Sequence, residues 1–292
     1  MKFNFIIGSL VWLMAINISP AADTVYGDIR QDTRWSGNLV LSGDVRVLKG
    51  VILYIEPTTR IEILPNTDIL HSGEDQERVE LIIEGSLIAH GEGHPRPIVF
   101  TSASATPQPG DWGGIVFKNF STNSHLENCI VEYACDGARI IGSAPQILGS
   151  EFRFNFRAGI SCEVRAFPYI EQTIFKNNHY AGLHCELAST PVVQNCEFQA
   201  NRYGVSIFSL SEPDLGHVPP KQGVSAGKNR FINNTSFDIY NHTRLTIYAQ
   251  NNLWSSRRND EIREKIFDNT MQKEMGRVVI QPIYRGLIIP VL

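Results

Sequence analysis

A block that repeats every 23 residues is the feature that most restricts how this chain can fold. Three segments begin with proline at this spacing and end with phenylalanine: Pro145–Phe152, Pro168–Phe175 and Pro191–Phe198. Each is followed by a turn with an asparagine (Asn155, Asn178, Asn201) and then by a glycine that opens a new stretch (Gly159, Gly182, Gly204). A less regular copy precedes them, at 126–141. A fixed period of this size is typical of stacked-repeat architectures.

Apolar and polar residues alternate within each block, which is the period of a β-strand and not of a helix. Each block holds about three short strands, and a strand without a partner in its own block must pair with its counterpart in the next. The sequence therefore predicts an all-β parallel β-helix with coils roughly 4.8 Å apart. The positions expected to point inward are Ile147, Ser150 and Phe152, then Ile170, Thr173 and Phe175, then Val193, Cys196 and Phe198.

The three turn asparagines are interpreted as structural residues. At equivalent turns their side chains can stack and hydrogen-bond to one another, and asparagine also tolerates a left-handed backbone. We therefore do not assign them a catalytic role.

The rest of the chain follows the same plan, with less regular units. Short strands run from Leu39 onward, with breaks at Gly43 and Gly50, and no linker divides the sequence into two domains. One domain is predicted over residues 22–292, with regular coils at about 126–254. The polar stretch 71–77 and the Pro- and Gly-rich stretch 209–228 are expected to be surface loops.

The C-terminal part, about 255–292, is predicted to be a cap. Asn259 and Asp260 can cap a short helix that runs to Phe267, with Ile262 and Ile266 on one face. Such a helix could cover the open end of the solenoid, whose last coil would otherwise expose unpaired edges. Two late strands are expected at 278–280 and 287–289.

The N-terminus predicts export. One lysine, an apolar run from Phe5 to Ile18 and small residues before the cut are typical of a signal peptide over 1–21. Cleavage after Ala22 and an uncleaved membrane anchor are the alternatives. No later segment is long and apolar enough to span a bilayer. The expected location is thus the periplasm, the cell surface or the medium. The balance of 26 basic against 30 acidic residues argues against a nucleic-acid partner.

The segments with the most specific sequence are Val51–Thr59, Ile82–Ala89, Asp111–Ile115, Pro213–Gly216 and Asn251–Trp254. With these residues the chain resembles the secreted bacterial right-handed parallel β-helix proteins of the pectate-lyase-like class, over nearly the whole mature chain. The resemblance implies a right-handed solenoid. It implies no single activity, because this fold carries lyases, hydrolases, epimerases, esterases and non-catalytic proteins.

The polygalacturonase-like members of that class share short catalytic motifs, and most of them are missing here. The sequence has no Asp-Asp, no Gly-His-Gly and no Arg-Ile-Lys. It has an Asn-Thr-Asp at 66–68, which we interpret as a turn because it follows Pro65 and lies far upstream of the regular coils. No cofactor is implied. A metal at His90 and His94 is not expected, because the glycines and proline around them forbid a helix.

The repeat itself indicates one set of catalytic candidates, Glu163, Glu186, His184 and Arg139. Ser161 and His184 are equivalent and expected to point outward, as are Glu163 and Glu186, with Arg139 one coil before Ser161. Two stacked glutamates repel, which could raise the pKa of one of them and prepare an acid. The alternative is a solvated face on which arginines neutralise the glutamates.

A second set, Arg157, Tyr180 and Tyr203, aligns at the turn and could bind sugar rings; ordinary turn packing is the alternative. Cys162 and Cys185 are one period apart inside the barrel. We favour buried free thiols there over a disulfide.

The leading hypothesis for function is an exported, non-enzymatic and monomeric module that presents an elongated face to a glycan or to a cell-envelope protein. A polysaccharide lyase or glycoside hydrolase that uses the four candidates is the first alternative. A structural spacer is the second.

Overall fold

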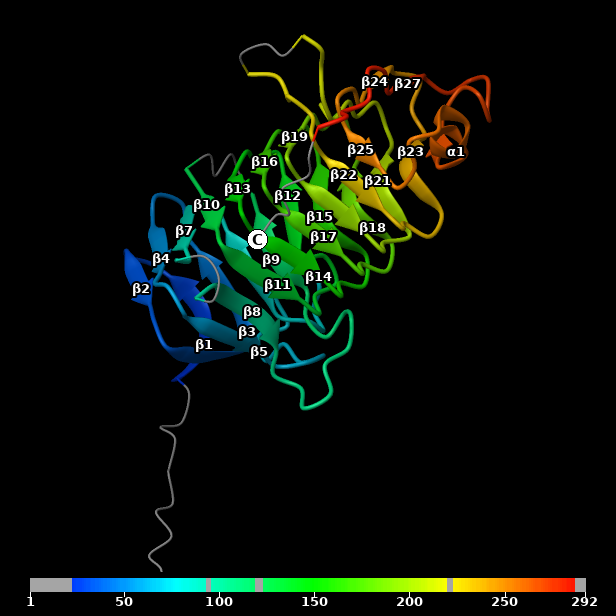
Figure 1. The fold of residues 1–292 in the computed structure, drawn as a ribbon. Coiled ribbons are helices and arrows are strands. Elements are labelled where there is room, and N and C mark those ends of the chain that lie inside the picture. Colours follow the sequence, from blue (N-terminus) through cyan, green and yellow to red (C-terminus); the bar gives the residue numbers. More distant parts are fainter. Residues whose placement is uncertain (1–22, 93–95, 119–122, 220–222, 287–292) are drawn as a thin grey trace, which may run out of the picture.

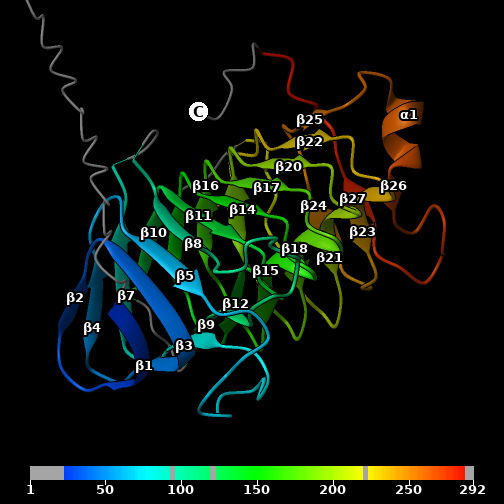
Figure 2. The same ribbon diagram turned by 90° about the horizontal axis from the view of Figure 1, so that it is seen from below.

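The protein is a parallel β-helix, as the period predicts. The computed structural model describes residues 23–92, 96–118, 123–219 and 223–286. The predicted signal peptide, the strand expected at 287–289 and His94 lie outside these residues. Successive coils stack along one axis, from β1 (Asp23–Ile29) and β2 (Thr33–Trp35) at one end to α1 (Asn259–Glu264) at the other (Figures 1 and 2).

Each regular coil contributes a strand to each of three rows, and every strand pairs in parallel with its counterparts in neighbouring coils. The first row continues from β2 with β4 (Ile52–Ile55), β7 (Ser86–His90), β10 (His125–Glu127), β13 (Gln146–Leu148), β16 (Tyr169–Glu171) and β19 (Val192–Gln194).

The second row comprises β5 (Arg60–Ile63), β8 (Ile98–Ser102), β11 (Cys129–Glu132), β14 (Glu151–Arg153), β17 (Ile174–Lys176), β20 (Glu197–Gln199), β22 (Arg230–Ile232) and β25 (Leu253–Trp254). The third row, which carries the candidate site, comprises β6 (Glu80–Ile83), β9 (Gly114–Phe117), β12 (Ala138–Ile141), β15 (Ala158–Glu163), β18 (Ala181–Cys185), β21 (Tyr203–Ile207), β23 (Phe237–Asn241) and β26 (Ile266–Phe267).

The strand β3 (Asn38–Val47) belongs to both of the last two rows, since its first half pairs with β5 and its second half with β6. The break expected at Gly43 is therefore wrong: the chain stays extended there. Two short strands, β24 (Ile247–Tyr248) and β27 (Val278–Val279), pair near the C-terminal end, and β27 confirms the first of the two late strands.

All nine predicted inward positions are buried. Their phenylalanines form a stack along the axis, with ring centroids 5.9 Å apart for Phe152 and Phe175 and 4.8 Å apart for Phe175 and Phe198. The stack explains the repeated glycines, because a Cβ on Gly182 would lie 2.7 Å from Phe198 Cδ1. Cys162 and Cys185 are buried free thiols, as favoured.

The turn asparagines also form the predicted ladder. Asn155 Nδ2 donates to Asn178 Oδ1 over 2.9 Å, and Asn178 Nδ2 donates to Asn201 Oδ1 over 3.0 Å. The left-handed residue, however, is the one that precedes each ladder asparagine, such as Phe154 with a φ of 54°. The ladder asparagines are therefore selected for their amide side chains, not for backbone freedom.

The C-terminal helix is shorter than predicted. It spans Asn259–Glu264 and its N-cap is Arg258, which makes no side-chain capping bond. The predicted cap at Asn259 and Asp260 is therefore wrong. Ile266 is buried but belongs to β26, because pairing with β23 supplies backbone hydrogen bonds that a longer helix would forfeit. Among the described residues no helix is long and apolar enough to cross a membrane.

Candidate functional site

One row of outward residues runs along the third row of strands, at positions directly opposite one another in successive coils. We call it the outer row. Its members in chain order are Val116, Arg139, Ser161, His184, Ser206, Tyr240 and Phe267. The predicted equivalence of Arg139, Ser161 and His184 is thereby confirmed. The row and its neighbours are charged in the middle coils and aromatic in the last ones.

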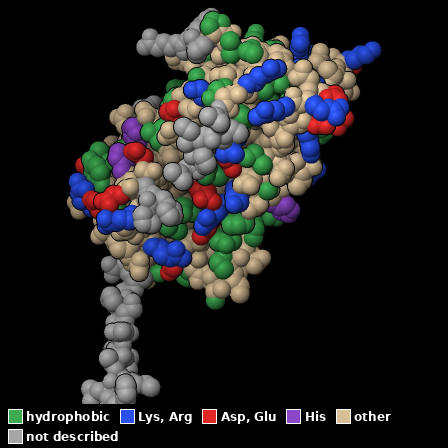
Figure 3. Space-filling view, in the orientation of Figure 1, with side chains coloured by type: hydrophobic (Ala, Val, Ile, Leu, Met, Phe, Trp, Pro, Cys, Tyr) green, Lys and Arg blue, Asp and Glu red, His purple; other side chains and the backbone are tan. Residues whose placement is uncertain are grey.

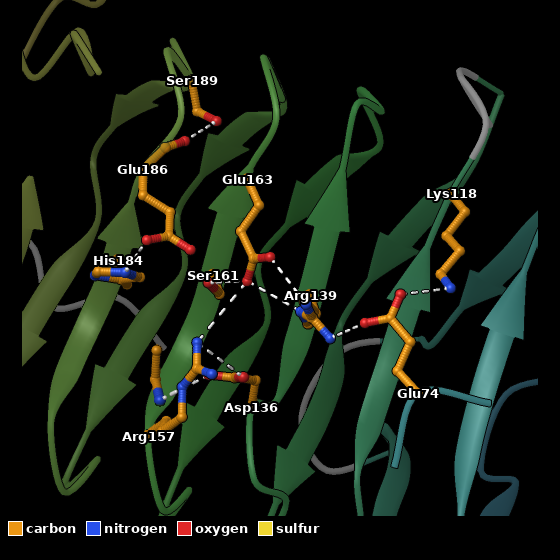
Figure 4. Close-up of polar contacts among 11 residues, drawn as sticks. Glu74, Lys118, Asp136, Arg139, Arg157, Ser161, Glu163, His184, Glu186 and Ser189 are labelled. Carbon is orange, nitrogen blue, oxygen red and sulfur yellow. Dashed lines mark hydrogen bonds and ion pairs between the residues drawn. The ribbon is translucent and has the colours of Figure 1, made fainter. Parts of the chain in front are cut away.

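The charged part is a chain of ion pairs (Figure 4). Arg139 donates from Nε to Glu163 Oε1 and from a terminal nitrogen to Glu163 Oε2, both over 3.0 Å. Its other terminal nitrogen contacts Glu74, whose second oxygen lies 2.7 Å from Lys118 Nζ. Glu74 comes from the loop between β5 and β6, so this chain of charges ties that loop to the strands. Acidic and basic side chains accordingly lie side by side near the middle of the face in Figure 3.

Glu163 is not the acid that stacking with Glu186 was expected to create. Glu163 is only 5% exposed, and this burial acts to raise the pKa of its carboxyl group. The hydrogen bonds and charge of Arg139 outweigh burial, and the pKa of Glu163 is lowered. Nor is the face solvated, as the alternative assumed, since Ser161 and His184 are buried as well. Arginines neutralise Glu163, as this alternative expected, whereas the partner of Glu186 is His184 and not an arginine.

Asp136 joins this network, although sequence reasoning did not single it out. Arg157 Nη2 lies 3.4 Å from Asp136 Oδ2 and 3.8 Å from Glu163 Oε1, so one guanidinium serves both carboxylates. Burial raises the pKa of Asp136 to about 6, although Arg157 acts to lower it. The residue lies in the less regular copy of the repeat, where the alignment gave no equivalent carboxylate to draw attention to it.

His184, Glu186 and Ser206 form a small polar group beside the charged part. His184 Nδ1 and Ser206 Oγ share a hydrogen bond of 2.9 Å, and His184 Nε2 lies 3.7 Å from Glu186 Oε2. Burial lowers the pKa of His184, so the imidazole is neutral at pH 7. The arrangement has the composition of a Ser-His-Glu triad. Ser206 is fully buried, however, so its hydroxyl cannot reach a substrate.

The aromatic part covers the last coils. Ring centroids lie 5.2 Å apart for Tyr180 and Tyr203, 5.0 Å for Tyr203 and Tyr240, and 4.6 Å for Tyr240 and Phe267. Further rings that contact this group are Phe208, Phe237 and His242. Most of these side chains are half-buried, so they pack on one another and still reach the surface.

The predicted alignment of Arg157, Tyr180 and Tyr203 is wrong by one residue. Ala181 pairs with Ala158 on one side and with Tyr203 on the other, so Arg202 and not Tyr203 follows Tyr180 along the solenoid. The turn before β21 is one residue shorter than its predecessors. The two tyrosine rings still meet, because the Tyr203 ring contacts that of Tyr180, and the Arg202 guanidinium lies 5.1 Å from the Tyr203 ring centroid. The Arg157 guanidinium pairs with Asp136 and Glu163 instead.

The site offers no evident place for a metal. Within the four described stretches, no group of three or more His, Cys, Asp or Glu side chains could hold a metal ion. The carboxylates of the charged part face arginine and lysine instead.

Comparisons with known proteins agree with this architecture. A family model described as a right-handed β-helix region matches residues 113–259, and one described as a pectate-lyase-like β-helix domain matches residues 27–133. Comparison with the curated proteins and with solved structures gives no match. Because the first family model alone covers half of the sequence, this chain belongs to the right-handed β-helix proteins.

Proposed function

We propose that this protein is an exported, non-enzymatic binding module that takes a glycan on the aromatic part of the outer row. The observation that carries the proposal is the continuous group of outward rings from Tyr180 to Phe267. These rings belong to successive coils and contact one another, and all of them except the buried Tyr203 are partly exposed.

Such a surface suits a sugar polymer. A sugar ring has C–H groups on its faces and hydroxyls at its edge, and it needs apolar contact and hydrogen bonds together. Tyr180 and Tyr240, which are half-buried, combine an apolar ring with a phenolic hydroxyl, so each offers both, and the buried Tyr203 packs against both rings. Arg202 adds donors next to them. An elongated partner can contact several coils at once, because equivalent positions recur along the axis.

The charged part supports binding over catalysis. Glu163 is occupied by two hydrogen bonds from Arg139, and its lowered pKa removes the proton that a general acid would have to donate. Ser206 is closed off by burial. In this proposal the ion pairs hold the loop that carries Glu74 against the strands, which fixes the shape of the face.

The export part of the proposal rests on the sequence alone. The apolar run and small residues at 1–21 favour a cleaved signal peptide, which would deliver the module to the periplasm, the cell surface or the medium. Appearance of the mature chain in a periplasmic or culture fraction, with its N-terminus at Ala22 or Asp23, is the outcome that we expect.

The glycan proposal is tested with the chain that begins at Ala22, on a glycan array and in a polysaccharide-depolymerisation assay. We expect binding without cleavage, and a loss of about tenfold or more in affinity for Tyr240→Ala. Tyr54→Ala, a partly exposed tyrosine on β4 in the first row, is the matched control and should bind normally. Equal losses in both variants, or no glycan binding at all, would contradict the proposal.

A polysaccharide-active enzyme is the second candidate, favoured by one observation. Asp136 has a pKa of about 6 and shares Arg157 with Glu163, so a protonated and an ionised carboxyl lie close together at mildly acidic pH. Cleavage that disappears both in Asp136→Asn and in a Glu163→Gln/Glu186→Gln double variant would replace the binding proposal with this one.

A further inference from the structure

A cavity of about 760 Å³ lies beside the charged part, and the proposed glycan face does not use it. Its described walls are apolar where Ile141, Val164 and Phe167 contribute, and charged where Glu74, Lys118 and Arg165 contribute. This volume is within the range of sites that enclose small organic ligands. The mixture of one apolar wall and one charged wall indicates the kind of ligand that would fit.

The apolar wall is exposed at an energetic cost. Val164 is 47% exposed and Phe167 is 49% exposed, although both are large apolar residues. Val164 and Arg165 also have left-handed backbones, with φ values of 54° and 61°. The same left-handed pair recurs in the next two coils, at Leu187–Ala188 and Ser209–Leu210, so it is the standard geometry of this turn, although a β-branched residue such as Val164 rarely adopts it. The turn thus projects an apolar and a cationic side chain at the cavity.

The charged wall carries a surplus of positive charge. Lys118 pairs with Glu74, and Glu74 is also paired with Arg139, which is not among the residues that line the cavity. Arg165 makes no ion pair with any residue that the structure describes. The three charged residues of the wall therefore sum to one positive charge, with a guanidinium free to take an anionic group in a two-pronged contact.

We infer that this cavity is a second binding site, for a small amphipathic anion: an apolar chain or ring that carries one carboxylate or similar group. The apolar body lies against Ile141, Val164 and Phe167, and the anionic group lies between Lys118 and Arg165. The site is separate from the aromatic part, so it stands whether or not a glycan binds there.

Decanoate is a suitable probe, titrated into the chain from Ala22 by isothermal calorimetry with decanol as its uncharged counterpart. We expect one site with a Kd of roughly 0.1–1 mM for decanoate, in keeping with its size, and binding of decanol at least about fivefold weaker. Arg165→Gln should weaken decanoate about fivefold and leave decanol unchanged, while Phe167→Asp should weaken both about tenfold.

One variant is expected to bind decanoate more tightly than the unaltered chain. Glu74→Gln removes the only carboxylate of the described wall and frees Lys118, so decanoate should bind about threefold to tenfold more tightly while decanol does not change. Phe156→Asp, a half-exposed phenylalanine outside the described lining, is the control and should behave as the unaltered chain. The inference fails if no binding is seen at a decanoate concentration tenfold above the expected Kd, or if decanol binds as tightly as decanoate. It also fails if Glu74→Gln has an unchanged circular dichroism spectrum but binds decanoate more weakly than the unaltered chain.

Discussion

Arg139 and Glu163 face each other across two neighbouring coils and are joined by two hydrogen bonds of equal length, 3.0 Å. The carboxylate is almost entirely buried, whereas the guanidinium is partly exposed and extends to Glu74 on a distant loop. The pair therefore does two things. It cancels a charge that the strands could not otherwise enclose, and it fastens the loop between β5 and β6 to the outer row.

Arg139→Met should lower the free energy of unfolding by about 3 kcal/mol, because it removes both hydrogen bonds of the guanidinium to the buried carboxylate of Glu163 and leaves only Ser161 and the more distant Arg157 beside it. Glu163→Gln should cost less, since the amide is neutral and the remaining arginine is still accessible to water. Urea denaturation followed by circular dichroism measures both. Arg258→Gln breaks a fully exposed pair with Asp260 and should have no measurable effect. A loss for Arg139→Met no larger than for Arg258→Gln would refute the structural role.

The asparagine ladder should be the most sensitive polar element of the fold. Asn178 donates to Phe152 O and to Asn201 Oδ1, and its own Oδ1 accepts from Asn155. Asn178→Ala therefore leaves buried donors and acceptors without partners, which should lower the free energy of unfolding by about 3 kcal/mol. The neighbouring Asn177→Gly is the control, because the φ of 55° there suits glycine and stability should change by less than about 1 kcal/mol. Thermal unfolding compares them, and similar losses would refute the ladder.

Asp136 should make the protein less stable as the pH rises through the range from about 4 to 6. Its pKa is about 6 in the folded protein, against an ordinary value of 3.8, so between these values the folded state binds more protons than the unfolded state. The free energy of unfolding contributed by this group is fully present below the unfolded pKa of 3.8. It falls by about 3 kcal/mol in total as the pH rises from there through the folded pKa.

Asp136→Asn removes that loss, because an amide does not titrate and its oxygen can still accept from the Ala158 N–H. The difference in unfolding free energy between Asp136→Asn and the unaltered chain should therefore grow in favour of the variant from pH 4 to pH 7. Arg157→Gln should extend the pH dependence upward, since it removes a cation that lowers the pKa of Asp136. Parallel pH profiles for all three proteins would show that Asp136 is not buried as described.

How far the sequence could predict this molecule depends on the range of the interactions. The period places Phe152, Phe175 and Phe198 inside, because each coil repeats the environment of the one before. It also places Arg139 next to Ser161 and so within reach of Glu163. It cannot place Glu74, which lies 65 residues from Arg139 in a loop with no counterpart in other coils.

The error at Tyr203 has a simple cause. Counting 23 residues from Tyr180 gives Tyr203, but the glycines at the second position of the two strands, Gly182 and Gly204, are only 22 apart. Aligning on these glycines, where the close approach of Phe198 to Gly182 and of Phe231 to Gly204 leaves no room for a Cβ, would have given Arg202 its correct place. In a β-helix, residues under steric restriction are thus better markers of register than the average period.

The strained turn at Val164 gives a last prediction: removing the side chain of this cavity-lining residue should make the protein more stable. A left-handed backbone costs a non-glycine residue about 1–2 kcal/mol, and Val164 at φ 54° recovers little of this by burial because half of its surface is exposed. Glycine relieves the strain but adds freedom to the unfolded chain, so Val164→Gly should raise the free energy of unfolding by about 0.5–1 kcal/mol. Val192→Gly, in strand β19, lacks such strain and should lower it by about 1 kcal/mol. Urea denaturation gives the sign of each change. Destabilisation of both variants to the same extent would mean that the turn is not strained.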